Sequence, residues 1–102
     1  MIPPKVREQL ANDPFMKRCI YHNSDCSGRV EWEHCFIYAG KQIQEAWAIV
    51  PCCTYHHRGA GLNKEFNQAI ALSRATDEDL AKYPKANFKQ QKKYLTKKYA
   101  TT

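Results

Sequence analysis

The sequence predicts a single small α+β domain, and three observations lead to this expectation. The chain has 102 residues, which is the length of one domain and close to the lower limit at which an apolar core suffices. Strand-like segments occupy its first half, and helix-like segments follow in its second half. Nine cysteine and histidine residues, four of them within residues 52–57, supply ligands for a metal ion that would supplement the core.

The N-terminal segment predicts a short helix. Pro3 and Pro4 precede KVREQL, and proline is favoured at the first position of a helix. Asn12-Asp13-Pro14 is a turn-forming sequence at which we expect this helix to stop.

Two strands are expected next. Residues 19–34 indicate a ligand-bearing loop and then a strand, in which Val30 and Trp32 alternate with charged residues. Ala39-Gly40-Lys41 predicts a loop. The apolar run AWAIVP predicts a second strand, which Pro51 should end.

The second half of the chain predicts helices. Asn63 is a favourable N-cap for a helix whose apolar residues follow at helical spacing. Thr76, followed by three acidic residues, indicates the start of a second short helix. Pro84 separates this helix from a last one, KANFKQQKKYLTKKY, in which Phe88 and Leu95 belong to a thin apolar stripe.

The spacing of cysteine and histidine predicts a closed zinc site. Cys53 and His56 form a C-x2-H pair, and Cys19 and Cys26 form a wider C-x6-C pair. Zinc prefers thiolate and imidazole ligands in a tetrahedron, usually supplied as two such pairs. The resulting Cys3His site would staple the two strands to the segment that precedes them.

Two alternative ligands remain possible for this site. Cys52 could replace Cys53, and His22 could replace one member of the first pair. If Cys53 is the ligand, we expect the side chain of Cys52 to point into the core. Cys35, which lies in the apolar sequence CFIY, should be a small buried hydrophobic residue.

The positive charge is concentrated at the C-terminus. Residues 1–81 contain nine Lys/Arg and ten Asp/Glu, whereas residues 82–102 contain seven lysines and no acidic residue. A basic segment on a near-neutral body favours binding to a polyanion, most simply a nucleic acid. The alternative is a solvated lysine-rich helix that aids solubility.

Composition also favours a cytoplasmic protein. No apolar run approaches the ~18 residues that a membrane-spanning helix needs, so we expect no membrane contact. The sequence MIPPKVREQL lacks the apolar centre of a secretory signal. Five cysteines, an odd number, fit metal binding in a reducing compartment better than a set of disulfides.

His34, His57 and Glu33 remain after the zinc ligands are assigned. The side chain of His57 should point away from the zinc site because neighbouring side chains diverge. A neutral imidazole can take a proton from water, and a carboxylate with an imidazole can hold a divalent ion. The alternative is a purely structural role for each histidine.

A recognisable pattern is formed by WEH (32–34), a stretch that contains YAGKQIQEAW, and IVPCCTYHH (49–57). In order, spacing and residue type this pattern resembles the zinc-containing branch of the HNH endonucleases, whose fold is the ββα-metal or His-Me finger. The resemblance covers about residues 19–58. It implies one domain with an N-terminal helix segment (1–18), a zinc-stapled ββα core (19–73) and basic C-terminal helices (74–102).

The resemblance implies a role for each matching residue. His34 would be the general base that activates water. Glu33, where the family often has Asp, and His57, which matches the final His, would bind the catalytic ion. The structural zinc positions of the family match the four residues Cys19, Cys26, Cys53 and His56.

One position departs from the pattern. The middle Asn, which in the family ties the loop and orients the base, should fall near Trp47 or Ala48. A backbone group or another side chain must therefore replace it, or the activity is weakened. Asn63 is a further candidate ligand, although it also suits the helix cap.

The implied function is metal-dependent hydrolysis of phosphodiester bonds in DNA, by analogy in phage DNA processing or recombination in a bacterial host cell. We expect Mg2+ as the catalytic ion, with Mn2+ or Ni2+ as alternatives. DNA binding should be salt-sensitive and weakly selective. The phosphate contacts would come from five basic residues: Lys41, Arg58, Lys89, Lys92 and Lys93. The competing interpretation is a non-catalytic zinc module that binds a nucleic acid or a protein partner.

Overall fold

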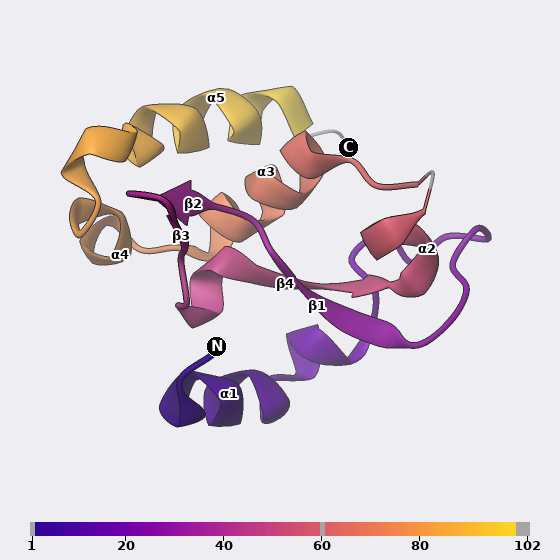
Figure 1. Cartoon of the computed structure of the whole chain (residues 1–102). Helices are drawn as coiled ribbons and strands as arrows, with labels where there is room; N and C mark the ends of the chain where they lie inside the picture. The colour runs from indigo at the N-terminus through magenta and orange to yellow at the C-terminus, as the bar shows by residue number, and fades with distance from the viewer. Residues whose placement is uncertain (1, 60, 100–102) are drawn as a thin grey trace.

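The computed structural model describes residues 2–59 and 61–99. Within them the chain is a small α+β fold with two short antiparallel sheets and five α-helices, which confirms the expected fold class (Figure 1). The strands are β1 (Val30–His34), β2 (Ile37–Tyr38), β3 (Lys41–Gln42) and β4 (Ile49–Cys53). The α-helices are α1 (Pro4–Ala11), α2 (Thr54–Arg58), α3 (Lys64–Arg74), α4 (Asp77–Ala81) and α5 (Phe88–Tyr99). Three 3-10 turns connect them: η1 (Pro14–Lys17), η2 (Ala46–Ala48) and η3 (Pro84–Ala86). Residues 100–102 of the C-terminal segment lie outside the described residues.

The larger sheet is a ribbon of β1 and β4. Its register pairs Val30 with Cys53 at one end and His34 with Ile49 at the other. Helix α2 follows β4 directly and packs back on both strands. Because side chains alternate along a strand, Glu31 and Glu33 lie on the same face of β1. This face is the one that α2 reaches.

The expectation that Pro51 ends the second strand is wrong, because β4 continues through it to Cys53. Pro51 is paired with Trp32, and its carbonyl points away from β1 to accept a hydrogen bond from Ile20 N at 3.0 Å. The N and C=O of one strand residue point to the same side, so the nitrogen of Pro51 also faces away from β1. The N–H that proline lacks would therefore not take part in the pairing with β1. The strand also begins later than expected, since η2 occupies residues 46–48.

The segment expected to be a loop at residues 39–41 is the tip of a tight hairpin. Strands β2 and β3 pair with each other, and Ala39 and Gly40 form the turn with φ values of 53° and 80°. A two-residue turn with both φ values positive matches the twist of the strands on either side. The hairpin reverses the chain, and as a result Gln44 lies beside His34.

Two helices of the second half begin where their caps predict, whereas α5 begins three residues later than the expected start at Lys85, because η3 and Asn87 with a φ of 60° precede it. The Oδ1 of Asn63 accepts a hydrogen bond from Phe66 N at 3.1 Å at the start of α3. Thr76 and Asp79 form a reciprocal capping box at the start of α4. Helix α5 packs along α3 and buries the two stripe residues Phe88 and Leu95.

Strand β4 is buried along its whole length and lies between two apolar clusters. Val50 and Cys52 face the larger cluster, together with residues of α3 and α5. Ile49 belongs to the smaller cluster, which includes Leu10 of α1 and Met16 of η1. The ribbon therefore packs against apolar clusters on both faces, and the polar side chains that it carries project from a rigid base.

Candidate functional site

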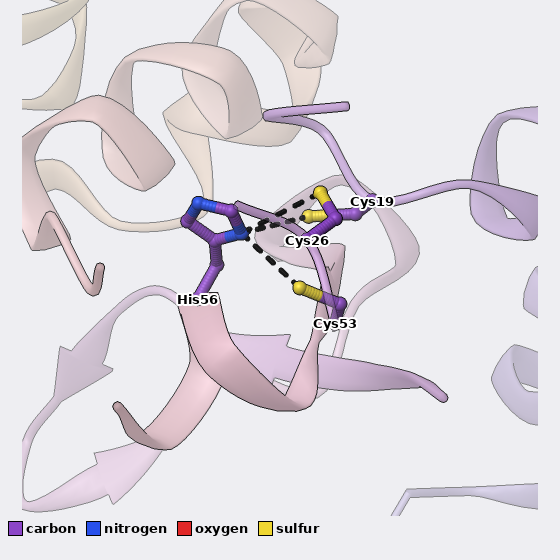
Figure 2. A group of neighbouring side chains, drawn as sticks. All are labelled: Cys19, Cys26, Cys53 and His56. Atoms are coloured by element: carbon purple, nitrogen blue, oxygen red, sulfur yellow. Dashed lines mark hydrogen bonds between the residues drawn. The ribbon is translucent and has the colours of Figure 1, made fainter. Parts of the chain in front are cut away.

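Four side chains meet at one point: Cys19 and Cys26 from the segment before β1, and Cys53 and His56 from the junction of β4 and α2 (Figure 2). Their ligand atoms all lie within 4.8 Å of one another. The Nδ1 of His56 is 3.1 Å from the sulfur of Cys53, 3.6 Å from that of Cys19 and 3.7 Å from that of Cys26. A tetrahedral zinc ion with ordinary bond lengths separates a nitrogen ligand from a sulfur ligand by about 3.6 Å. This cluster, the set that the spacing predicted, can hold a metal ion such as zinc.

The junction of β4 and α2 positions two of these ligands. Cys53 is the last residue of β4 and the N-cap of α2, so His56 follows within the first helical turn. Burial raises the pKa of Cys53, but hydrogen bonds from His56 and Ser27 outweigh it and bring the pKa to about 6. At neutral pH this thiol is largely thiolate, the form that binds a metal. Tyr21 stacks on the His56 ring at a centroid distance of 4.1 Å and fixes its plane.

The loop that carries Cys26 passes close to the start of α2. Gly28 in this loop has a φ of +80°, and a Cβ at that position would lie 2.5 Å from the Oγ1 of Thr54. Glycine is therefore required here both by its backbone conformation and by the close approach. The contact holds Cys26 against the helix that carries His56.

The two open alternatives for the ligand set lie outside the cluster. Cys52 is fully buried in the core, and burial raises the pKa of its thiol to about 12. His22 is exposed on the loop between Cys19 and Cys26. Cys35 packs against the core, and burial also raises the pKa of its thiol. Neither Cys52 nor Cys35 belongs to the group of ligand atoms that lie within 4.8 Å of one another.

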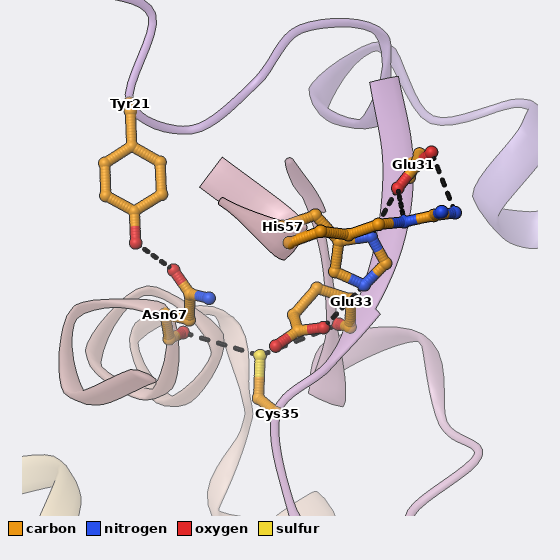
Figure 3. Close-up of polar contacts among 7 residues, drawn as sticks. Tyr21, Glu31, Glu33, Cys35, His57 and Asn67 are labelled. Carbon is orange, nitrogen blue, oxygen red and sulfur yellow. Dashed lines mark hydrogen bonds and ion pairs between the residues drawn. The ribbon is translucent and has the colours of Figure 1, made fainter. Parts of the chain in front are cut away.

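His57 belongs to a second cluster, on the face of β1 that α2 covers. Its Nδ1 lies 2.6 Å from Glu31 Oε1, and its Nε2 lies 2.8 Å from Glu33 Oε1 (Figure 3). Arg58 also binds Glu31 with two hydrogen bonds, of 3.0 and 3.1 Å. The hydrogen bond with His57 and the charge of Arg58 hold the pKa of Glu31 below its usual range, against the opposing effect of burial. Glu31 thus remains an acceptor that fixes the orientation of the imidazole.

The donor atoms of Glu33 and His57 suit a divalent ion. Two adjacent ligands of an octahedral ion at 2.0–2.1 Å lie about 2.9 Å apart, close to the 2.8 Å between Glu33 Oε1 and His57 Nε2. A histidine ligand commonly donates its other ring N–H to a carboxylate, and Glu31 is placed to accept it. In this structure the two atoms contact each other directly, at the distance of a hydrogen bond or ion pair.

His34 is the last residue of β1, and its ring is held by Gln44. The Nε2 of His34 lies 2.8 Å from the Oε1 of Gln44. With the Gln44 amide in this orientation, the contact assigns the proton to Nε2, because an amide oxygen can only accept a hydrogen bond. The lone pair of a neutral His34 is then on Nδ1, which leaves this nitrogen able to accept a proton.

Glu33 and His34 both line one hollow of about 430 Å³ at the end of β1. Its opposite wall is formed by the first turns of α3, with Lys64, Asn67 and Gln68. His57 is not among the described residues that line this hollow and is connected to it through Glu33. The structure therefore places Glu33 in contact with His57 and in the same hollow as His34, whereas among the described residues no hydrogen bond or ion pair joins His34 to His57.

The five basic residues expected to contact phosphates are dispersed. Lys41 is exposed on β3, and Arg58 is bound to Glu31. Lys89, Lys92 and Lys93 of α5 line a different, shallow hollow, and the Nζ of Lys92 donates a hydrogen bond to Ala75 O at 2.7 Å. None of the five is among the residues that line the hollow of His34.

Sequence reasoning missed Glu31 and Gln44. Glu31 stands two residues before Glu33 on a strand, so alternation alone would have placed both carboxylates on one face. Gln44 has no such signal, because the sequence predicts only a loop at Ala39-Gly40-Lys41 and not the pairing of β2 with β3 that brings Gln44 back to His34.

Comparison of the chain with protein-family models, with curated proteins and with solved structures finds no match. In the described part of the chain, none of the helices has the length and apolar character needed to cross a membrane.

Proposed function

We propose that this protein is a metal-dependent endonuclease of the HNH type, built on a zinc-stapled ββα-metal finger, that hydrolyses phosphodiester bonds of DNA. One observation supports the proposal: the junction of β4 and α2 supplies two ligands of the Cys3His cluster, Cys53 and His56, and also His57, which contacts Glu33, the chain neighbour of His34. A carboxylate–imidazole pair beside an imidazole nitrogen without a partner among the described residues suits metal-assisted hydrolysis.

Glu33 and His57 would hold the catalytic ion. Their oxygen and nitrogen donors suit Mg2+ first, and Mn2+ or Ni2+ as softer alternatives. Such an ion, when bound, stabilises negative charge on phosphate oxygens and on the leaving oxygen. Glu31 keeps the Nε2 of His57 directed at Glu33 through its hydrogen bond to Nδ1.

His34 would act as the general base. Its Nδ1 takes a proton from the attacking water, while Gln44 holds the Nε2 proton and the plane of the ring. Gln44 would therefore replace the middle Asn of the family pattern, which Trp47 and Ala48 cannot supply because both are buried in the core.

The basic residues of α5 and β3 would hold DNA without reading its sequence. The exposed lysines of α5 and Lys41 contact a backbone by charge, and charge contacts to phosphates carry no base information. We therefore expect binding to fall steeply with salt.

A supercoiled-plasmid assay tests the proposal. Zinc-loaded protein is incubated with Mg2+, Mn2+ or Ni2+, and parallel reactions contain EDTA added immediately before the plasmid. We expect nicked and linear product only with the divalent ion, and none with Glu33→Gln. Cleavage that persists in Glu33→Gln at the wild-type rate would exclude this site.

A zinc-containing nucleic-acid-binding module is the second candidate. It is favoured by the fact that every ring nitrogen of His57 and the Nε2 of His34 already has a partner in the chain. Salt-dependent DNA binding without cleavage in any of the three ions would favour this candidate.

A further inference from the structure

The hollow beside Glu33 and His34 has a second wall to which no role has been assigned. It is built by the first turns of α3, with Lys64 at the first helical position and Asn67 one turn later. The volume of the hollow, about 430 Å³, exceeds what one phosphate group needs and leaves room for part of the adjoining sugar.

Lys64 offers an unused positive charge at this wall. It is exposed, and its ammonium group has no hydrogen-bond or ion-pair partner among the described residues. By contrast, Lys98 is paired with Glu65, and Lys92 with the carbonyl of Ala75. The position of Lys64 at the N-terminus of α3 adds the positive end of the helix dipole to its charge.

Asn67 offers an unused donor at the same wall. Its residue exposure is 1%, and its Oδ1 accepts a hydrogen bond from the Tyr21 hydroxyl at 2.6 Å. Its Nδ2 is buried and has no partner among the described residues. In Figure 3 this nitrogen points away from Tyr21, toward the side on which Glu33 and Cys35 lie. A buried donor without a partner is costly and rare, which is expected where a ligand supplies the acceptor.

We propose that this wall is a phosphate subsite, in which Lys64 supplies the charge and the Asn67 amide supplies a hydrogen bond to an oxygen of a DNA phosphodiester. The subsite deepens the proposed function and rests on it, because it places the phosphate opposite Glu33 and His34. It assigns substrate binding to α3, in addition to the lysines of α5.

DNA binding in Ca2+, which does not require cleavage, tests the subsite. Fluorescence anisotropy with a short duplex gives the Kd of wild type, Lys64→Ala, Lys64→Arg and the matched control Lys5→Ala, whose lysine is exposed on α1. We expect Lys64→Ala to raise the Kd about tenfold and Lys64→Arg to restore most of the affinity. An effect of Lys64→Ala no larger than that of Lys5→Ala overturns the subsite, whatever the plasmid assay shows.

The amide is tested by NMR and by an isosteric variant. We expect the duplex to shift the side-chain amide signal of Asn67, and an unchanged signal at saturation overturns the assignment. Asn67→Asp keeps the acceptor for Tyr21 and removes the donor, and its fold is verified by zinc content and Tm. It should weaken duplex binding at least as much as Lys64→Ala. Inorganic phosphate that shifts the Asn67 signal and is not displaced by the duplex would overturn the nucleic-acid assignment.

Discussion

His56 and His57 are adjacent in the chain but belong to two different clusters. The Nδ1 of His56 faces three cysteine sulfurs at 3.1–3.7 Å, whereas both nitrogens of His57 contact glutamates of β1. Successive residues of a helix point about 100° apart, so a single turn can serve two sites. Because one turn serves both clusters, the sequence PCCTYHHRG contains two cysteines and two histidines within six residues.

Serine substitutions should show that the neighbouring residues Cys52 and Cys53 have different roles. We expect Cys53→Ser to lose zinc and to lower the Tm strongly, because in a chain of this size the metal supplements a small core. Cys52→Ser should keep one zinc per chain, since Cys52 faces the core. Elemental analysis and thermal unfolding measure both effects. One zinc per chain in both variants would show that the ligand set is wrong.

Glu31 should control the affinity of the second site. Glu31→Ala removes the acceptor for the Nδ1 proton of His57, and loss of such a supporting carboxylate typically weakens metal binding by about 10–100-fold. Glu31→Gln, which keeps an acceptor oxygen, should restore much of the affinity. Calorimetric titration of zinc-loaded protein with Mn2+ measures this, with the exposed Glu8→Ala of α1 as control. Equal Mn2+ affinity in Glu31→Ala and Glu8→Ala would contradict the assignment.

Gln44 should set the protonation pattern of the His34 ring. Gln44→Met keeps the length of the side chain but removes the acceptor, so the proton is no longer held on Nε2. We expect kcat to fall about tenfold with little change in KM. The nitrogen-15 shifts of His34 report the tautomer directly and need no activity. A wild-type tautomer in Gln44→Met would refute the role of Gln44, and Gln9→Met on α1 serves as the control.

Acidification should loosen the contact between α3 and α5. Glu65 accepts hydrogen bonds from Lys98 Nζ at 2.6 Å and from the Tyr99 hydroxyl at 2.8 Å, and the bond from Lys98 is the main reason that its pKa is lowered from 4.5. A lowered pKa stabilises the fold above pH 4.5, and this stabilisation is lost as the pH falls through the folded-state value. We therefore expect Glu65→Gln to lower the Tm slightly at pH 7 and not at all in strong acid. A difference in Tm that is independent of pH would contradict this explanation.

The elements with local signals could be predicted from the sequence. Asn63 and Thr76 mark helix starts through caps that depend only on nearby residues. The spacing of Cys53 and His56 likewise indicates one metal site, because a strand end followed by a helical turn fixes both side chains.

The features that depend on distant pairing could not be predicted. Pro51 remains in β4 because of the side on which β1 pairs, and no local pattern gives that side. Gln44 reaches His34 only through the hairpin of β2 and β3. The Nδ2 of Asn67 has no partner among the described residues, because Tyr21, which is distant in sequence, contacts only the amide oxygen of Asn67.

The most direct test of the central proposal is the single-turnover rate of cleavage of a labelled DNA duplex by wild type and His34→Ala at saturating Mg2+ or Mn2+. His22→Asn is the matched control, because His22 is exposed and lies outside both clusters. We expect His34→Ala to be slower by about 10²–10⁴-fold, the usual contribution of a general base, and His22→Asn to match wild type. Metal-dependent cleavage by wild type that does not exceed that of His34→Ala would contradict the account.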